Sequence, residues 1–239
     1  TLGYAFGTDG TLLETKDGGY SWDLLNTYQL GITSKIVAAQ PTAVVNGTAK
    51  MIFSTAKGEV LLLNNGSLSI IANVGVAIAS ITDMTLIDET SNQLKVKLTG
   101  TQTNSTWGSV GIIVSGKLTY NTSSWSESWT VDELKLPSLA KSAFYTATDG
   151  YIFRADGQFV QLKTVNGVAQ QIIKVSNLAL PMKTVYFLNE NRGITVLEEN
   201  QNTRIGVTMD GGLTWSFPSV LANNHFEMAL IQKTTNQLN

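Results

Sequence analysis

The sequence predicts an all-β fold built from repeated four-stranded units. Two near-copies of one eight-residue signature lie toward opposite ends of the chain, at residues 15–22 and 208–215. Between them, short apolar runs alternate with turns that contain glycine, which is the pattern of consecutive β-strands. Only 14% of the 239 residues are charged, while 43% are hydrophobic, enough for a substantial core. A repeat of this kind indicates the architecture of the whole chain.

The repeated signature has the chemistry of a tight hairpin. Both copies read Ser/Thr-x-Asp-x-Gly-x-Ser/Thr-Trp, and their residues are Thr15, Asp17, Gly19, Ser21 and Trp22 in the first copy and Thr208, Asp210, Gly212, Thr214 and Trp215 in the second. The Asp carboxylate can accept hydrogen bonds from backbone N–H groups two residues on, and Gly supplies a positive φ without steric cost. The hydroxyl of Ser21 or Thr214 can form a hydrogen bond with another polar group of the turn. The tryptophan begins the next strand, and we expect its ring to pack in a dry place between neighbouring blades.

This signature resembles the Asp-box, also called the bacterial neuraminidase repeat, which lies on the turn between the two outer strands of a β-propeller blade. Residues 3–22 are similar to the repeat of propellers of the photosystem II assembly-factor type, in which a strand with the pattern Gly-aromatic-x-x-Gly precedes the Asp-box. The resemblance covers two blades. It implies a β-propeller in which the ten signature residues shape hairpins and contact no substrate, so that Asp17 and Asp210 are structural and not catalytic.

The first and last strands predict how the ring of blades closes. Residues 3–25 supply the second, third and fourth strands of an N-terminal blade whose first strand is missing. Residues 226–232 form one apolar strand that has no hairpin partner of its own. We expect this C-terminal strand to complete the N-terminal blade, because such pairing removes the open edges of the ring.

The other blades follow in order along the chain and make one domain of residues 1–239. The predicted blades are residues 35–71, 81–136, 142–175 and 185–218. The second blade has Gly-containing turns, and the longer connections of the third blade indicate an insertion. In the fourth blade the first strand is uncertain. The fifth blade carries the second signature. At roughly 40 to 50 residues per blade, the chain forms about five blades, with six as the alternative.

Composition excludes several kinds of site. The chain has no cysteine and a single histidine, His225, so no Cys-based metal site, disulfide or His-pair metal site is predicted, and no cofactor either. Net charge is −2 without any Lys/Arg cluster, which excludes nucleic acid as a partner. The longest apolar run, residues 70–81, is too short to span a bilayer, so no membrane insertion is expected.

A sialidase-like or other glycosidase activity is the catalytic alternative. Sialidases bind the substrate carboxylate with three arginines, and this chain has three, Arg154, Arg192 and Arg204. They lie in different strands and turns of the predicted blades. The adjacent carboxylates Glu198 and Glu199 would point to opposite faces of a strand and cannot act as a matched acid and base. We therefore predict a protein that is not an enzyme. A glycosidase with an unfamiliar site would need carboxylates that converge at the central mouth of the ring.

The segment 99–130 is the candidate ligand-binding region. It contains Trp107, Tyr120, Trp125 and Trp129 among Ser, Thr and Asn. Aromatic faces beside hydroxyl and amide groups suit sugar rings or the central residues of a protein interface. The alternative is that these tryptophans are ordinary packing residues between blades.

Together these features predict a non-catalytic binding or scaffolding module. A Thr-, Ser- and Asn-rich composition with few charges favours an extracellular or virion component, such as part of a phage tail or receptor-binding apparatus. The expected partners are other protein subunits or a surface glycan, and the chain would form oligomers through a larger assembly. An assembly factor of the photosystem II type is the alternative that the resemblance implies. Such relatives often carry an arginine-rich partner patch, which three scattered arginines do not provide.

Overall fold

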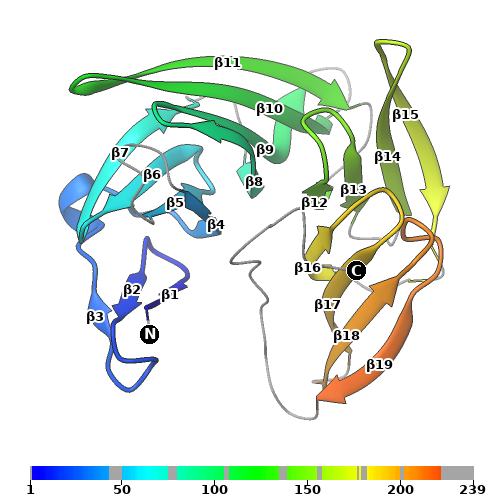
Figure 1. Cartoon of the computed structure of the whole chain (residues 1–239), viewed down its shortest axis with the longest axis horizontal. Helices are drawn as coiled ribbons and strands as arrows, with labels where there is room; N and C mark the ends of the chain where they lie inside the picture. The colour runs from blue at the N-terminus through cyan, green and yellow to red at the C-terminus, as the bar shows by residue number, and fades with distance from the viewer. Residues whose placement is uncertain are drawn as a thin grey trace. The chain divides into compact units, whose positions relative to one another are not determined.

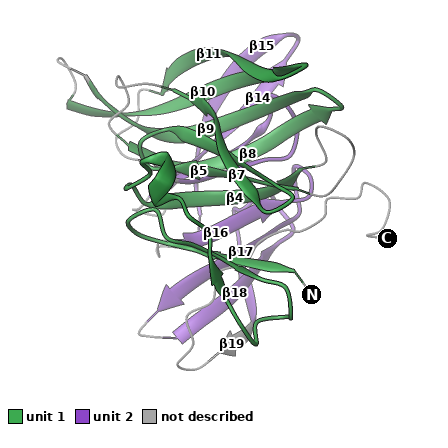
Figure 2. Cartoon of the chain, turned by 90° about the vertical axis from the view of Figure 1, so that its left-hand side faces the viewer, with its two compact units in different colours: residues 1–134 green, residues 135–239 purple. Residues whose placement is uncertain are grey.

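The chain is almost entirely β-structure. The computed structural model describes residues 2–42, 50–74, 80–104, 108–134, 139–154, 158–176, 178, 182–199 and 202–221. Over these residues it consists of antiparallel sheets and one short 3-10 helix, Tyr28–Leu30 (Figure 1). The chain divides into two compact units, residues 1–134 and 135–239, which are coloured separately in Figure 2.

The first sheet of unit 1 has three strands in the order β1-β2-β3. These strands are Gly3–Phe6, Leu12–Thr15 and Asp23–Leu24. They correspond to the three strands that the sequence predicts for the N-terminal blade. The strand that we expect to complete this blade, residues 226–232, lies outside the described residues.

The second sheet of unit 1 has four strands in sequence order. Strands β4 to β7 are Ile36–Thr42, Lys50–Thr55, Glu59–Asn64 and Ser67–Asn73. Asn65 and Gly66 join the last two strands, with φ of 49° and 75°. Positive φ at both positions of a two-residue loop gives the twist that neighbouring strands need, which explains why the sequence has Asn-Gly there.

The third sheet is also four-stranded, but its strands are much longer. Strands β8 to β11 are Ser80–Thr90, Gln93–Asn104, Gly108–Asn121 and Ser124–Leu134. The sequence predicts an insertion with long connections here, and the structure differs. The additional residues lengthen the strands, which are 11, 12, 14 and 11 residues long, and two-residue turns join β8 to β9 and β10 to β11. Apolar and polar residues alternate over the first half of β9, where Leu94, Val96 and Leu98 are buried, and the buried stretch continues through Thr99.

Unit 1 has two clusters of buried apolar side chains. One lies between the second and third sheets and includes Ile52, Val60, Met84, Leu98 and Val114, all almost completely buried. The other includes Leu12, Ile32 and Phe53 and links the first sheet to the second. Direct contacts between β4 and β8 join the second sheet to the third.

Unit 2 contains two further four-stranded sheets. Strands β12 to β15 are Leu139–Phe144, Gly150–Arg154, Gln158–Val165 and Val168–Val175, and strands β16 to β19 are Met182–Phe187, Gly193–Glu199, Asn202–Thr208 and Ser216–Leu221. The first strand of the fourth blade, which the sequence leaves undefined, is β12. An aromatic cluster joins the two sheets and includes Tyr151, Phe153, Phe159, Phe187 and Trp215.

Each four-stranded sheet has its strands in sequence order, which is the meander of a propeller blade. The described residues contain four such blades and three strands of another. The prediction of an all-β propeller with about five blades is therefore confirmed.

Candidate functional site

The first signature forms a closed network of hydrogen bonds within its own turn. The hydroxyl of Thr15 donates to Asp17 Oδ1 at 2.8 Å and accepts from the N–H of Gly19 at 2.8 Å. Asp17 accepts from the N–H of Ser21 at 3.0 Å and from its hydroxyl at 2.6 Å. The donor N–H lies four residues beyond the aspartate and not two, because Gly18 and Gly19, with φ of 84° and 98°, turn the backbone around the carboxylate.

The second signature forms the same network in unit 2. Thr208 donates to Asp210 Oδ1 at 2.9 Å and accepts from Gly212 N–H at 2.9 Å. Asp210 accepts from Thr214 N–H at 2.9 Å and from its hydroxyl at 2.6 Å. These hydrogen bonds of the two carboxylates join residues of the same turn.

The tryptophans that end the two signatures have different surroundings. Trp215 is 5% exposed and donates its indole N–H to the carbonyl of Gly212 at 3.1 Å. Trp22 is 43% exposed. The expected dry site is thus present around Trp215, within the aromatic cluster of unit 2, whereas a large part of Trp22 faces solvent.

The hydrogen bonds of these turns predict a dependence of stability on acid. Donation from the Ser21 hydroxyl and N–H and from Thr15 lowers the pKa of Asp17. For Asp210, burial raises the pKa, but the hydrogen bonds from Thr214 and Thr208 outweigh that effect and the pKa is lowered. A carboxyl whose pKa is lower in the folded state stabilises the fold above its unfolded pKa, near 3.9, and loses this effect as the pH falls through the folded pKa.

We therefore expect the free energy of unfolding to fall with decreasing pH below about 4, and the fall to be shallower in Asp17→Asn and Asp210→Asn variants. Denaturant unfolding at a series of pH values between about 6 and 2 measures both slopes. Asp23→Asn is the control, since this exposed aspartate lies outside the turn network. Identical acid slopes in wild type and both turn variants would contradict the expectation.

The aromatic candidates of the third blade lie on one face of the β10–β11 hairpin. Tyr120 and Trp125 are directly opposite each other, and their ring centroids are 5.4 Å apart with the planes tilted by 52°. Both side chains are half-buried. Trp107, the fourth candidate, lies outside the described residues.

Trp129 lies on the same face of this hairpin, directly opposite Gly116. A Cβ atom at Gly116 would lie 2.0 Å from the indole ring, so the ring rests on the glycine backbone. Trp125 and Trp129 also pack against the apolar cluster between the second and third sheets. These two tryptophans therefore contribute to blade packing, and the ring pair of Tyr120 and Trp125 lies nearest the turn.

Polar contacts tie the third blade to the second near this ring pair. The backbone N–H of Asn73 donates to Glu127 Oε2 at 2.9 Å, and the hydroxyl of Thr42 donates to Glu89 Oε2 at 2.6 Å. The N–H of Tyr120 donates to the carbonyl of Asn92 at 2.7 Å and so joins the two turns at this end of the blade. Both side-chain contacts are made with the second blade, so this end of the third blade is held against that neighbour.

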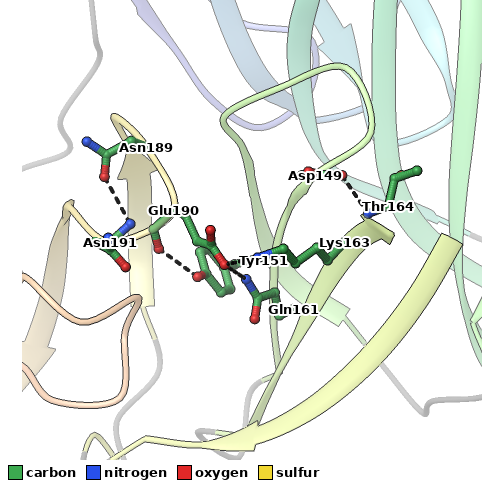
Figure 3. Close-up of polar contacts among 8 residues, drawn as sticks. All are labelled: Asp149, Tyr151, Gln161, Lys163, Thr164, Asn189, Glu190 and Asn191. Atoms are coloured by element: carbon green, nitrogen blue, oxygen red, sulfur yellow. Dashed lines mark hydrogen bonds and ion pairs between the residues drawn. The ribbon is translucent and has the colours of Figure 1, made fainter. Parts of the chain in front are cut away.

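Unit 2 contains a polar cluster centred on Glu190, in the turn between β16 and β17 (Figure 3). Its carboxylate Oε1 accepts from Gln161 Nε2 at 3.0 Å and from Lys163 Nζ at 2.5 Å. Its backbone carbonyl accepts from the hydroxyl of Tyr151 at 2.7 Å. Hydrogen bonds from Lys163 and Gln161 lower the pKa of Glu190, and burial raises the pKa of Tyr151.

Sequence reasoning missed the Glu190 cluster. The only local signal is the polar turn itself, in which Asn189 Oδ1 accepts from the N–H groups of Asn191 and Arg192 at 2.9 Å each. The neighbouring Gly211 N–H donates to the Asn191 carbonyl at 2.9 Å, so this turn also contacts the second signature turn. The cluster joins the fourth and fifth blades.

The three arginines do not converge on one point. Arg204 binds Glu199 at 2.5 Å and lies over the Phe217 ring, and Arg154 binds Gln158 at 2.6 Å. Arg192 directly precedes β17, whose first residue, Gly193, pairs with Thr208. Arg204 pairs with Leu197, four residues further along β17, so these two strand positions are roughly 13 Å apart. These contacts do not form a carboxylate clamp.

The adjacent glutamates have separate partners, since Glu198 pairs with Lys183 at 3.0 Å whereas Glu199 binds Arg204.

Among the described residues, no group of three or more His, Cys, Asp or Glu side chains could hold a metal ion. The same residues contain no helix long and apolar enough to cross a membrane.

Comparison with known proteins identifies the fold. No protein-family model matches the sequence, and no curated protein sequence does. Among solved structures, the chain is similar to YCF48 from Cyanidioschyzon merolae, with 14% identity over 90% of this chain and 68% of that one and a TM-score of 0.51. It is also similar to a lectin from Aleuria aurantia, with 14% identity over 96% and 76% of the two chains and a TM-score of 0.53.

A third similar structure consists of the WD40 repeats of RRP9, with 10% identity over 92% of this chain and 77% of that one and a TM-score of 0.50. WD40 repeats form propeller blades, so this likeness agrees with the sheet order described above. At these identities the comparisons establish the propeller fold and leave the ligand to be inferred from the residues.

Proposed function

We propose that this chain is a non-catalytic binding module whose ligand contacts the hairpin end of the third blade, at Tyr120 and Trp125. The observation that carries the proposal is the tilted ring pair at 5.4 Å, half-buried beside the turn of an unusually long hairpin. Partly exposed aromatic rings supply contact area at a low cost in conformational entropy.

Aromatic rings at the end of the hairpin favour a carbohydrate ligand, because they can stack on the apolar face of a sugar. The serines of β11, Ser124, Ser126 and Ser128, form an exposed row on the opposite face of the hairpin, where the Asn121 amide donates to the Ser126 hydroxyl at 3.0 Å. The Aleuria aurantia lectin, described as a complex with alpha-methyl-L-fucoside, has a similar fold, which agrees with this choice.

We place the module on an extracellular or virion surface, where surface glycans and other subunits are the partners. The support for this location is compositional: a low charged fraction and many Thr, Ser and Asn residues.

Binding of the purified chain to a broad glycan array tests the proposal. Wild type is expected to give a signal that is lost in Trp125→Ala and in Tyr120→Ala. Trp22→Ala is the matched control, because it truncates another half-exposed tryptophan of the same unit and should leave the signal unchanged. Circular dichroism of every variant checks that the strands remain folded.

Two outcomes would overturn the proposal. A glycan signal that survives in both folded hairpin variants would remove Tyr120 and Trp125 from the site. No signal from folded wild type would reject a carbohydrate ligand and favour the second candidate, an assembly factor of the photosystem II type that binds a protein partner. The fold shared with YCF48 favours that candidate.

A further inference from the structure

We propose that strand β15 pairs edge to edge with the same strand of a second copy of this chain. This strand, Val168–Val175, is the last in the sheet order β12-β13-β14-β15, and no described strand pairs with its outer edge. Its apolar side chains are exposed, with Val168 at 63%, Ile173 at 66% and Val175 at 72%. An exposed apolar edge strand offers unpaired backbone groups to another strand.

The outer strands of the other described sheets have features that discourage such pairing. Strand β3 has only two residues, and β19 contains Pro218. Strand β11 carries Glu127, Asp132 and Glu133. Strand β7 contacts β11, and its Asn73 N–H donates to Glu127. Short strands, proline and charges are the usual protection of a sheet edge, and β15 lacks all three apart from one lysine.

That lysine does not protect the edge. Lys174 Nζ lies 5.8 Å from the centroid of the Tyr151 ring, and Tyr151 is on β13, two strands further into the sheet. The only charge of β15 is therefore directed back over its own sheet. An uncharged edge has no group that would select an acidic or a basic peptide, whereas an identical edge can approach it without repulsion.

Two-fold symmetry gives the pairing a small number of registers. We consider two antiparallel copies of β15 that are related by a two-fold axis perpendicular to the sheet. In this arrangement, residues that are directly opposite each other lie on the same face of the sheet, so one residue at the centre is opposite its own copy. With Gln171 at the centre, Lys174 is opposite Val168 of the partner strand. With Ile172 at the centre, it is opposite Gln170. Neither register brings like charges together, and both cover Ile173.

Single cysteines test the pairing directly, because the chain contains none of its own. Either Gln171→Cys or Ile172→Cys is expected to form an intermolecular disulfide under mild oxidation, since the central residue faces its own copy within reach of such a bond. Ser128→Cys, exposed on the outer strand of the third blade, is the control and should form no intermolecular disulfide, because its cysteine lies outside the proposed contact.

Sedimentation velocity of the unmodified chain supplies the second measurement. The sedimentation coefficient is expected to rise with protein concentration for wild type, and Ile173→Lys should abolish that rise. Val131→Lys, which adds the same charge at an exposed valine of β11, should leave it unchanged. A wild type that stays monomeric at all concentrations, or a dimer that persists in Ile173→Lys, would overturn the proposal. If wild type stays monomeric, the outer edge of β15 could still pair with a strand of a different protein, but not with a second copy of this chain. Neither measurement depends on glycan binding.

Discussion

Truncation of Tyr151 to alanine is expected to lower the free energy of unfolding by about 3–5 kcal/mol. Its ring is completely buried and lies in the aromatic cluster of unit 2, with its centroid 4.4 Å from that of Phe187 and 5.8 Å from that of Phe159. The substitution removes this packing and leaves a cavity that rigid neighbouring strands fill only in part. It also removes the hydroxyl that donates to the Glu190 carbonyl.

A second substitution separates these two contributions. Tyr151→Phe keeps the ring and removes only the hydrogen bond, so we expect a loss of about 1–3 kcal/mol from the unsatisfied carbonyl. Tyr20→Ala is the matched control for truncation, because Tyr20 is 94% exposed and should change stability by less than about 0.5 kcal/mol. Denaturant unfolding measures all three variants. Equal losses in Tyr151→Ala and Tyr151→Phe would show that the ring contributes no packing energy.

Substitution of Gly116 by alanine is expected to cost about 1–3 kcal/mol and to displace the Trp129 ring. The new methyl group would lie 2.0 Å from the indole and cannot coexist with it. The strands on either side of Gly116 are paired along their length, so the backbone has little room to move. Tryptophan fluorescence reports the displacement, and denaturant unfolding reports the cost.

A double-mutant cycle identifies the cause of that cost. With Trp129→Ala as the background, Gly116→Ala should become nearly neutral, because the colliding ring is absent. Ser115→Ala, next to Gly116 but on the opposite face of the strand, controls for any change in strand propensity. A cost of Gly116→Ala that is the same in both backgrounds would exclude the indole as its source.

The sequence by itself determined the features that depend on neighbouring residues. Each signature turn closes through hydrogen bonds between residues at most four positions apart, so the local pattern alone assigns Asp17 and Asp210 to hairpins. The order of short strands follows from the same local patterns, and the spacing of the strands predicts about five blades, with six as the alternative. In the third blade the alternation of residues is visible too, but the sequence predicts loops for the added length, which belongs to the strands.

Only the tertiary structure decided what surrounds each side chain. Trp22 and Trp215 occupy the same position of the same signature, yet one is 43% exposed and the other 5%, because burial depends on distant strands. Glu190 is bound by residues 27 to 39 positions away, and no pattern in its own turn predicts them. Several contacts between neighbouring blades join residues 39 to 54 positions apart, about the length of one blade, but which side chains meet at that separation is decided only in three dimensions, as is the open edge of β15.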